Sequence, residues 1–259
     1  MERRRGRDYT RPLSALLSLE NVARRFGGIV ALDDVSFTVE QGQIVGLIGP
    51  NGAGKTTAFN VISRLYRPSA GNVVFDGRDL LRVSPHRVLK LGIARTFQNL
   101  ALFTHMTVLE NILVAADSHY GRLRERQGHR SARETLEYVG LAEVADAPAS
   151  GLPYGTLKRV EIGRALVAQP RLLLLDEPAG GLSHEEVGEL AAFVRRIRDD
   201  RDLTVLLVEH HMNLVMGVSD TVHVLDFGRL IATGPPELVR DDPAVIEAYL
   251  GPERPHVAS

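Results

Sequence analysis

Gly49-Pro50-Asn51-Gly52-Ala53-Gly54-Lys55-Thr56 is the most informative stretch of the chain, because it matches the phosphate-loop pattern G-x-x-x-x-G-K-[ST] in full. Glycines let backbone N–H groups converge on phosphates in conformations that a Cβ atom opposes. Lys55 supplies a mobile charge for the β- and γ-phosphates of ATP, and the Thr56 hydroxyl suits Mg²⁺. The residues predicted to bind the nucleotide are Gly49, Pro50, Asn51, Gly52, Ala53, Gly54, Lys55, Thr56 and Thr57.

The residues on both sides of this loop support the prediction. Ile44–Ile48 is a continuous apolar run, as in a strand buried in a parallel sheet. A helix is expected from about Thr56 to Tyr66, stopping before Pro68. The N-terminus of that helix adds free N–H groups and a dipole that favour an anion. An ordinary glycine turn with a surface lysine is the competing interpretation, and the strand–loop–helix context disfavours it.

A second apolar run ends in two acids. Leu172–Leu175 predicts a buried strand, and Asp176 and Glu177 follow it directly. Asp176 is the expected partner of Mg²⁺, and Glu177 is placed to act as a base toward the attacking water. Two acids at a solvent-exposed strand end would be the alternative, but four leucines place this strand in the core.

The remaining pattern indicates one α/β domain with an inserted helical lobe. Strands are predicted at Leu17–Phe26, Val35–Glu40, Val73–Phe75 and Val205–Val208, with a hairpin-like pair at Val222–Leu225 and Arg229–Ala232. From about 85 to 168 the periodicity is helical, and Ser131 with Glu134 and Ser183 with Glu186 are predicted to form helix-starting capping boxes. The fold class is therefore an α/β P-loop NTPase core with an N-terminal antiparallel β region and a helical lobe, covering residues 14–251.

Composition excludes several classes of function. The 259-residue chain has a net charge of -1 and a pI of about 6.8, so no overall basic field favours nucleic acid. The absence of cysteine excludes disulfides, zinc–thiolate sites and a cysteine nucleophile. No apolar run reaches the roughly 18 residues that a membrane helix needs. Residues 1–13 predict a disordered basic tail, in preference to a contact with anionic lipid, and residues 252–259 form a C-terminal tail.

With these motifs in place, the chain resembles the nucleotide-binding subunit of an ATP-binding cassette (ABC) transporter from about Leu17 to Gly251. Gln98, in Arg95-Thr96-Phe97-Gln98, matches the glutamine of the family that meets Mg²⁺ and the water. Phe26 matches the aromatic residue that stacks on adenine, and His210 matches the switch histidine at the γ-phosphate. The resemblance implies an ATPase whose catalytic residues are Glu177, His210 and Gln98. Its implied magnesium site consists of Thr56, Gln98 and Asp176.

The signature motif departs from the family pattern. In place of Leu-Ser-Gly-Gly-Gln the chain has Leu152-Pro153-Tyr154-Gly155-Thr156. In the family, the signature binds the nucleotide of the opposite subunit, so Pro153, Gly155 and Thr156 are expected to act in trans. Pro153 lacks both the hydroxyl and a backbone N–H. We therefore expect an asymmetric heterodimer with one weaker site; the alternative is that the Gly155 backbone and the helix dipole suffice.

Two further positions also differ from the family. Ser183 replaces a usual aspartate, and both residues cap helices well, so the structural role is expected to persist. His211 stands where aspartate is common, and no function is attached to it.

Within the family, the chain is most similar to the branched-chain amino-acid importer group. The stretches that carry this resemblance are Ala94–Leu100, Met106–Asn111, the Tyr-Gly signature and Asp242–Gly251. Urea importers and lipopolysaccharide exporters share much of the pattern, so both stay open as functions. The competing classes of protein are soluble ABC ATPases without a permease, small-molecule P-loop kinases and non-enzymatic binding modules. A kinase would leave the Gln98, signature and His210 series unexplained.

The resemblance also implies partners and a location. The expected partners are a second ATP-binding subunit, membrane permease subunits and, indirectly, a solute-binding protein, with no nucleic acid. The complex would hold the chain at the cytoplasmic side of the membrane. Apolar residues after Gln98 are predicted to dock the permease, although packing under the helical lobe is the competing interpretation. These residues are Leu100, Leu102, Phe103 and Met106.

Overall fold

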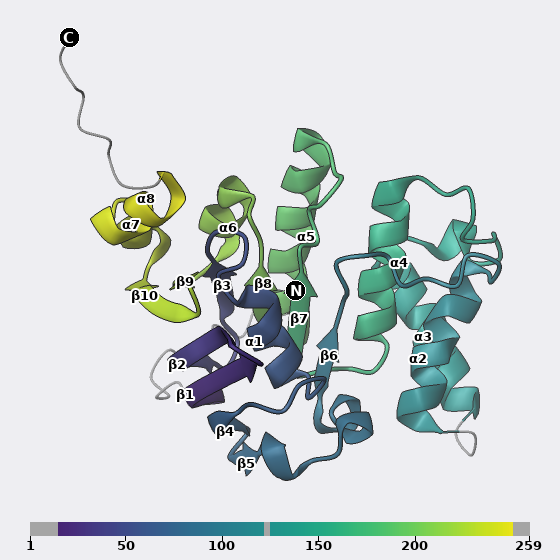
Figure 1. Ribbon diagram of the computed structural model, residues 1–259. Helices are drawn as coiled ribbons and strands as arrows, with labels where there is room; N and C mark the ends of the chain where they lie inside the picture. The colour runs from purple at the N-terminus through teal and green to yellow at the C-terminus, as the bar shows by residue number, and fades with distance from the viewer. Residues whose placement is uncertain (1–14, 122–124, 251–259) are drawn as a thin grey trace, which may run out of the picture.

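The computed structural model describes residues 15–121 and 125–250, which form two β-sheets and surrounding helices (Figure 1). The two predicted tails, 1–13 and 252–259, lie outside the described residues. The larger sheet has the strand order β10-β9-β3-β8-β7-β6. Its strands are β3 (Ile44–Ile48), β6 (Ile93–Arg95), β7 (Leu172–Asp176), β8 (Thr204–Val208), β9 (Thr221–Asp226) and β10 (Arg229–Gly234). All of its pairs are parallel except β9 with β10, which is the predicted hairpin.

The smaller sheet is antiparallel throughout, in the order β2-β1-β4-β5. Its strands are β1 (Ala15–Phe26), β2 (Ile29–Glu40), β4 (Ala70–Phe75) and β5 (Arg78–Asp79). It confirms the predicted N-terminal β region. The continuous apolar runs of β3, β7 and β8 are buried at every position, as expected for central parallel strands covered on both faces.

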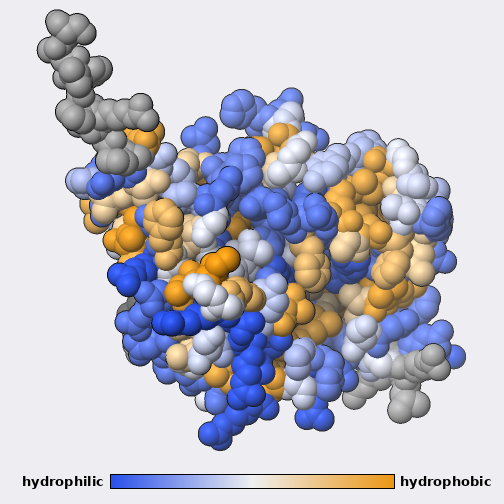
Figure 2. Space-filling view, viewed as in Figure 1, coloured by the Kyte–Doolittle hydropathy of each residue, from blue (hydrophilic) through white to orange (hydrophobic). Residues whose placement is uncertain are grey.

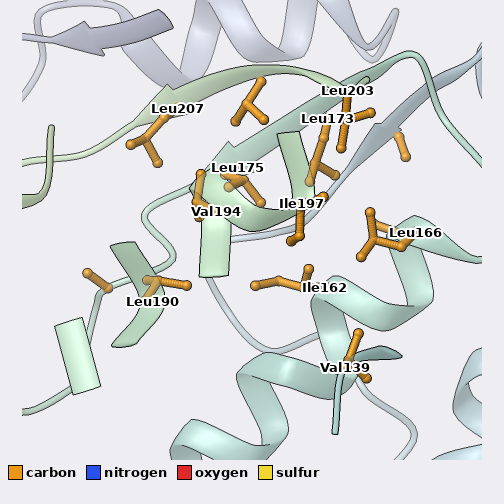
Figure 3. Close-up of a cluster of buried hydrophobic side chains, with 14 of the residues drawn as sticks. Val139, Ile162, Leu166, Leu173, Leu175, Leu190, Val194, Ile197, Leu203 and Leu207 are labelled. Carbon is orange, nitrogen blue, oxygen red and sulfur yellow. The ribbon is translucent and has the colours of Figure 1, made fainter. Parts of the chain in front are cut away.

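The central sheet separates two hydrophobic cores, because successive side chains of a strand point to opposite faces. Val45 and Leu47 of β3 join the core shared with β1, β2 and α1 (Lys55–Ile62). Ile44 and Ile48 join the other core, shared with α4 (Tyr154–Leu166), α5 (His184–Arg201) and α6 (Met212–Val218). Part of this second core is drawn in Figure 3, where side chains of α4, α5, β7 and β8 meet.

The helical lobe consists of α2 (Val108–Tyr120), α3 (Glu125–Tyr138) and α4, which gather on the right of Figure 1. At the opposite side, α7 (Pro236–Arg240) and α8 (Pro243–Leu250) pack beside β10. The lobe begins later than its periodicity suggested. Between 85 and 91 the chain forms two 3₁₀ turns, and the three residues of β6 pair with β7. So short a strand shows no period of its own in the sequence.

Two other helix boundaries differ from expectation. The helix after the phosphate loop ends at Ile62 rather than Tyr66, since Arg64 adopts a left-handed φ of 63°. The predicted capping box at Ser131 is wrong, because Ser131 lies inside α3 and its buried hydroxyl donates to the carbonyl of Val167. The box at Ser183 is confirmed: Ser183 Oγ accepts from the backbone N–H of Glu186, and the Glu186 carboxylate accepts from that of Ser183.

Candidate active site

The carboxyl ends of β3, β7 and β8 lie side by side. Val208 of β8 is in register with Leu47 of β3 on one side and with Asp176 of β7 on the other. The segments that follow these strands therefore meet at one edge of the sheet, where ligands of open α/β sheets bind. We call this the carboxyl edge; it comprises residues 49–57, 176–177 and 209–210.

The phosphate loop at this edge requires glycine at two positions. A Cβ atom at Gly49, whose φ is 147°, would lie 2.0 Å from the carbonyl oxygen of Leu225. A Cβ atom at Gly54, whose φ is 106°, would lie 2.5 Å from the carbonyl oxygen of Ala31. Side chains other than hydrogen are excluded at both places. The loop therefore has neighbours that hold its backbone, and the N-terminus of α1 follows it directly.

Lys55 is buried within this loop. Its Nζ donates hydrogen bonds to the carbonyl oxygens of Gly49, at 2.7 Å, and Pro50, at 2.9 Å. Burial lowers the pKa of Lys55, and the nearby carboxylates of Glu177 and Asp176 partly oppose that shift. The structure thus brings together the lysine and both acids that the sequence selected, which lie more than 100 residues apart in the chain.

Asp176 has a partner that the sequence did not reveal. Arg95 of β6 forms a buried ion pair with it, with Nη2 donating to Oδ2 at 2.7 Å. The other terminal nitrogen of Arg95 donates to Asn60 Oδ1 and Ser63 Oγ, at the end of α1. The arginine therefore connects β7 to the helix of the phosphate loop. The signal available in the sequence was a charged residue following two apolar ones, Ile93 and Ala94, in an otherwise apolar strand.

The other predicted catalytic residues surround Glu177. Gln98 Nε2 donates to Glu177 Oε2 at 2.8 Å, and His210 Nδ1 lies 3.9 Å from the same oxygen. Glu177 itself has a left-handed φ of 47°, and its N–H donates to the carbonyl of Val208. The three residues predicted to act in catalysis are thus gathered around one carboxylate oxygen.

The side chains predicted to hold Mg²⁺ all offer oxygen. They are the exposed Thr56 hydroxyl on the first turn of α1, the Asp176 carboxylate and the side-chain amide oxygen of Gln98. Oxygen-only sets of this kind suit Mg²⁺, which binds through one or two carboxylates, waters and substrate phosphates. Arg95 bonds one of the two Asp176 oxygens, so the residues present fit a magnesium ion.

Phe26 ends β1 at the tip of the first hairpin and is partly exposed. Its ring meets the ring of Tyr66 edge-on, with centroids 5.2 Å apart, and the Arg24 guanidinium lies 4.4 Å from its centroid. The strand that follows the hairpin tip contacts the phosphate loop at Gly54, next to Ala31. The predicted adenine-stacking residue is therefore on the hairpin whose second strand borders the loop.

The predicted signature residues lie elsewhere. Pro153 is the N-cap of α4, and Gly155 and Thr156 lie in the first turn of that helix. They line a cavity of about 440 Å³ between α4 and α5, to which no residue of the carboxyl edge contributes. A Cβ atom at Gly155 would lie 2.8 Å from Glu186 Oε1, so the close neighbour of this glycine belongs to the same chain. The described residues do not bring the signature to their own phosphate loop.

Taken by its chemistry, the carboxyl edge is suited to transfer of a phosphoryl group to water. A buried ammonium group at the N-terminus of a helix favours a polyphosphate. A carboxylate held by an amide beside it can accept the proton of an attacking water. None of the described helices combines the length and apolar content that a bilayer crossing requires.

Comparison with known proteins places these observations in a family. The model of the ABC transporter family matches residues 32–180, and a model described as branched-chain amino acid ATP-binding cassette transporter matches residues 229–251. The chain is 42% identical over 249 residues to the high-affinity branched-chain amino acid transport ATP-binding protein BraF of Pseudomonas aeruginosa. That alignment covers 91% of this chain and 98% of the relative.

Two further similarities agree with these matches. LivG of Escherichia coli K12, also a high-affinity branched-chain amino acid transport ATP-binding protein, is 41% identical, again over 91% of this chain and 98% of the relative. A crystal structure of the ADP conformation of an ATP-binding cassette of an ABC transporter superposes with a TM-score of 0.83 at 32% identity. The superposition covers 92% of this chain and 100% of the chain in that crystal structure.

Proposed function

The chain belongs to the ABC transporter family, as one of its ATPase subunits, and from this premise we propose that it powers the uptake of branched-chain amino acids. The observation that carries the proposal is the extent of similarity: it runs through almost the whole chain and includes the C-terminal segment 229–251. In this family the ATPase subunit does not contact the transported solute, so the solute is inferred from sequence similarity to the relatives.

The proposed chemistry assigns a role to each residue of the carboxyl edge. Lys55 and the loop N–H groups bind the β- and γ-phosphates, and Glu177 accepts a proton from the attacking water. Gln98 holds the carboxylate of Glu177 and His210 contacts the γ-phosphate. Thr56, Asp176 and Gln98 would hold Mg²⁺, which neutralises charge on the phosphates when it is bound.

The proposed partners are a second ATP-binding subunit and membrane permeases, with a solute-binding protein acting through the permeases. This would keep the chain at the cytoplasmic face of the membrane. The signature supports a two-subunit arrangement, since Pro153, Gly155 and Thr156 lie apart from the phosphate loop of their own chain. These three residues are proposed to meet nucleotide held by the partner.

The segment 97–106 is the proposed permease contact. Glu161 of α4 accepts the N–H of Phe97 at 2.8 Å, and Asn111 of α2 bonds both the N–H and the carbonyl of Phe103. Buried side chains thus hold the segment at Phe97 and at Phe103, while these two phenylalanines stay 41% and 47% exposed. In Figure 2 apolar side chains gather over the helical lobe, on the right of the view.

The same contacts separate the candidates in this segment. Leu102 packs against the hydrophobic core of the lobe, as the competing interpretation expected, whereas Phe103 and Met106 are exposed. Phe103→Glu is therefore the cleaner test of docking, with Leu102→Glu as the variant that should cost stability.

The function is tested in proteoliposomes that contain the chain, its permeases and its solute-binding protein. We expect ATP-dependent accumulation of radiolabelled leucine, absent in Glu177→Gln and strongly reduced in Phe103→Glu. The Phe103→Glu chain should keep the melting temperature and nucleotide affinity of the wild type. Uptake of urea without leucine, or ATPase stimulation by lipopolysaccharide, would reject the amino-acid proposal and leave the ATPase assignment intact.

A further inference from the structure

Glu209, the last residue before the switch histidine, is a fully buried carboxylate to which no sequence motif assigns a role. It follows β8 directly, between Val208 and His210. Burying a carboxylate in a protein interior is costly unless hydrogen bonds replace the lost water. The partners of Glu209 therefore indicate why an acid stands here.

The two oxygens of Glu209 serve two different loops. Oε1 accepts the backbone N–H of Ala179, two residues after Glu177, at 2.7 Å. Oε2 accepts the backbone N–H groups of His210 and His211, at 2.9 and 3.2 Å, and lies 3.1 Å from His211 Nδ1. One side chain thus fixes the distance between the loop that follows the catalytic glutamate and the segment that carries the switch histidine.

The first of these loops holds a strained residue. Glu177 has a φ of 47°, a left-handed backbone conformation that residues other than glycine, asparagine and aspartate rarely adopt. Such a conformation persists only where the surroundings determine it. Three hydrogen bonds do so here: Glu177 N–H to the Val208 carbonyl, Gly180 N–H to the Glu177 carbonyl, and Ala179 N–H to Glu209.

We propose that Glu209 is a positioning residue for ATP hydrolysis, which holds the Glu177 carboxylate and the His210 imidazole in their mutual arrangement by bonding both backbones. The inference rests on the proposed role of Glu177 as the base. Because its bonds go to backbone N–H groups and to the His211 ring, and none goes to the phosphate loop, Glu209 acts on turnover far more than on ATP affinity.

The substitution Glu209→Gln tests this directly, since an amide has one acceptor oxygen. If that oxygen accepts from Ala179, the amide NH₂ group faces the N–H groups of His210 and His211, donor against donor. If it is turned the other way, Ala179 loses its acceptor. Either orientation releases one loop, so glutamine should act like alanine although it has the same shape.

The experiment compares Glu209→Gln and Glu209→Ala with Ile197→Val in the full-length chain, each paired with the second ATP-binding subunit. Ile197 is buried in α5 about 20 Å along the helix from Ser183, so its substitution lowers stability without touching either loop. The measurements are kcat, KM, the ATP dissociation constant, the melting temperature and amide hydrogen exchange of residues 179–183. Both Glu209 variants should lose about 10- to 100-fold in kcat, as for an approximately 1 Å misplacement of a reacting group.

With that loss, ATP affinity should stay within about threefold of the wild type, and hydrogen exchange at 179–183 should accelerate in the Glu209 variants and not in Ile197→Val. The proposal is overturned if kcat stays within twofold of the wild type, if Ile197→Val shows an equal loss of kcat, or if ATP affinity falls in proportion. Glu177→Gln is measured in parallel. If that chain still turns over, the role of Glu177 as the base fails; if it is inactive while the Glu209 variants are normal, only the role of Glu209 fails.

Discussion

The carboxyl edge and the N-terminal end of α4 are both polar regions of the molecule, but they differ in how far the chain itself satisfies them. At the carboxyl edge Lys55 is bonded within its own loop, and Asp176 and Glu177 each have a partner from a distant segment of the chain. At α4 the N-cap is Pro153, with no side-chain cap and no acid in the first turn. By contrast, α2 and α5 begin with complete capping boxes.

The difference indicates which region is complete within the chain and which one needs a group from another molecule. Because the carboxyl edge is assembled from its own residues, its folding and its nucleotide binding can be tested in the chain alone, whereas turnover is measured with the second subunit present. The first turn of α4 presents backbone N–H groups that no described side chain caps, as suits a helix end completed by an anion from elsewhere. This agrees with the proposal that the signature serves a nucleotide held by a second subunit.

The largest expected effect is at the carboxyl edge. Glu177→Gln should lower ATP turnover by roughly 10²- to 10⁴-fold, the usual contribution of a positioned base, while ATP binding changes little. Steady-state ATPase assays and titration with a fluorescent nucleotide check both halves of this outcome. Glu237→Gln, at an exposed glutamate on α7, is the matched control and should be silent. Residual turnover above about a tenth of wild type would remove Glu177 as the base.

Arg95→Met should act on folding more than any change at α4. It leaves the buried Asp176 carboxylate without its cation, and breaking a buried pair from one side costs about 3–5 kcal/mol. Urea denaturation measures the loss. The double variant Arg95→Met with Asp176→Asn should recover most of the stability but not the turnover. If the single variant is as stable as the wild type, the Arg95–Asp176 ion pair does not stabilise the carboxyl edge, and the contrast with α4 fails.

The signature end should respond modestly and in trans. With Glu177→Gln in this chain, turnover in a heterodimer belongs to the site whose phosphate loop is the partner's. Restoring Pro153→Ser and Thr156→Gln should raise that turnover by about 2- to 10-fold, the worth of one net hydrogen bond. ATPase assays of the paired subunits measure it, and disabling the partner's own catalytic glutamate should cancel the gain. An active, cooperative homodimer that is indifferent to both substitutions would contradict the asymmetry.

The smallest expected effect is a loss of stability at low pH, caused by His223 in strand β9. His223 of β9 is buried, with Nε2 bonded to the Thr38 carbonyl and Nδ1 to the Thr233 hydroxyl, and burial lowers its pKa. Below about pH 6.5 the unfolded chain binds a proton at this histidine and the folded chain does not, so the free energy of unfolding falls as the pH drops. His223→Gln should flatten this fall, by at most about 1.4 kcal/mol per pH unit in denaturation curves. As the pH is lowered, amide hydrogen exchange should accelerate in β2 and β10 before it does in α4. Equal acceleration in the strands and in α4 would contradict this prediction.

The sequence was sufficient where the determinants are local. The phosphate loop, the strand before it and the acids after Leu175 follow from residues that are neighbours in the chain. Arg95 and Glu209 were missed because their partners are remote: 81 residues separate Arg95 from Asp176, and 30 separate Ala179 from Glu209. No periodicity or motif reports such pairs, since the fold alone brings them together.

Capping boxes show the same limit at the scale of one helix turn. The pattern of serine followed three residues later by glutamate is correct at Ser183 and wrong at Ser131, inside α3. A third box, Thr107 with Glu110, starts α2 and is not among those predicted. The same side-chain spacing fits a helix interior, where serine can bond another element, so the pattern marks a start only when the preceding backbone is extended.

The position of Lys55 has a consequence for which nucleotides the loop selects. Its ammonium group already bonds the carbonyls of Gly49 and Pro50, and it is shielded from water. A ligand must therefore compete with two partners that the protein supplies itself. A monophosphate that stops short of Nζ gains nothing from the lysine, whereas a phosphate that reaches it exchanges neutral acceptors for a charged one, a stronger bond. The loop thus discriminates against nucleotides whose phosphates stop short of Nζ: selectivity against a monophosphate arises from an exchange of partners, without a pocket shaped to exclude it.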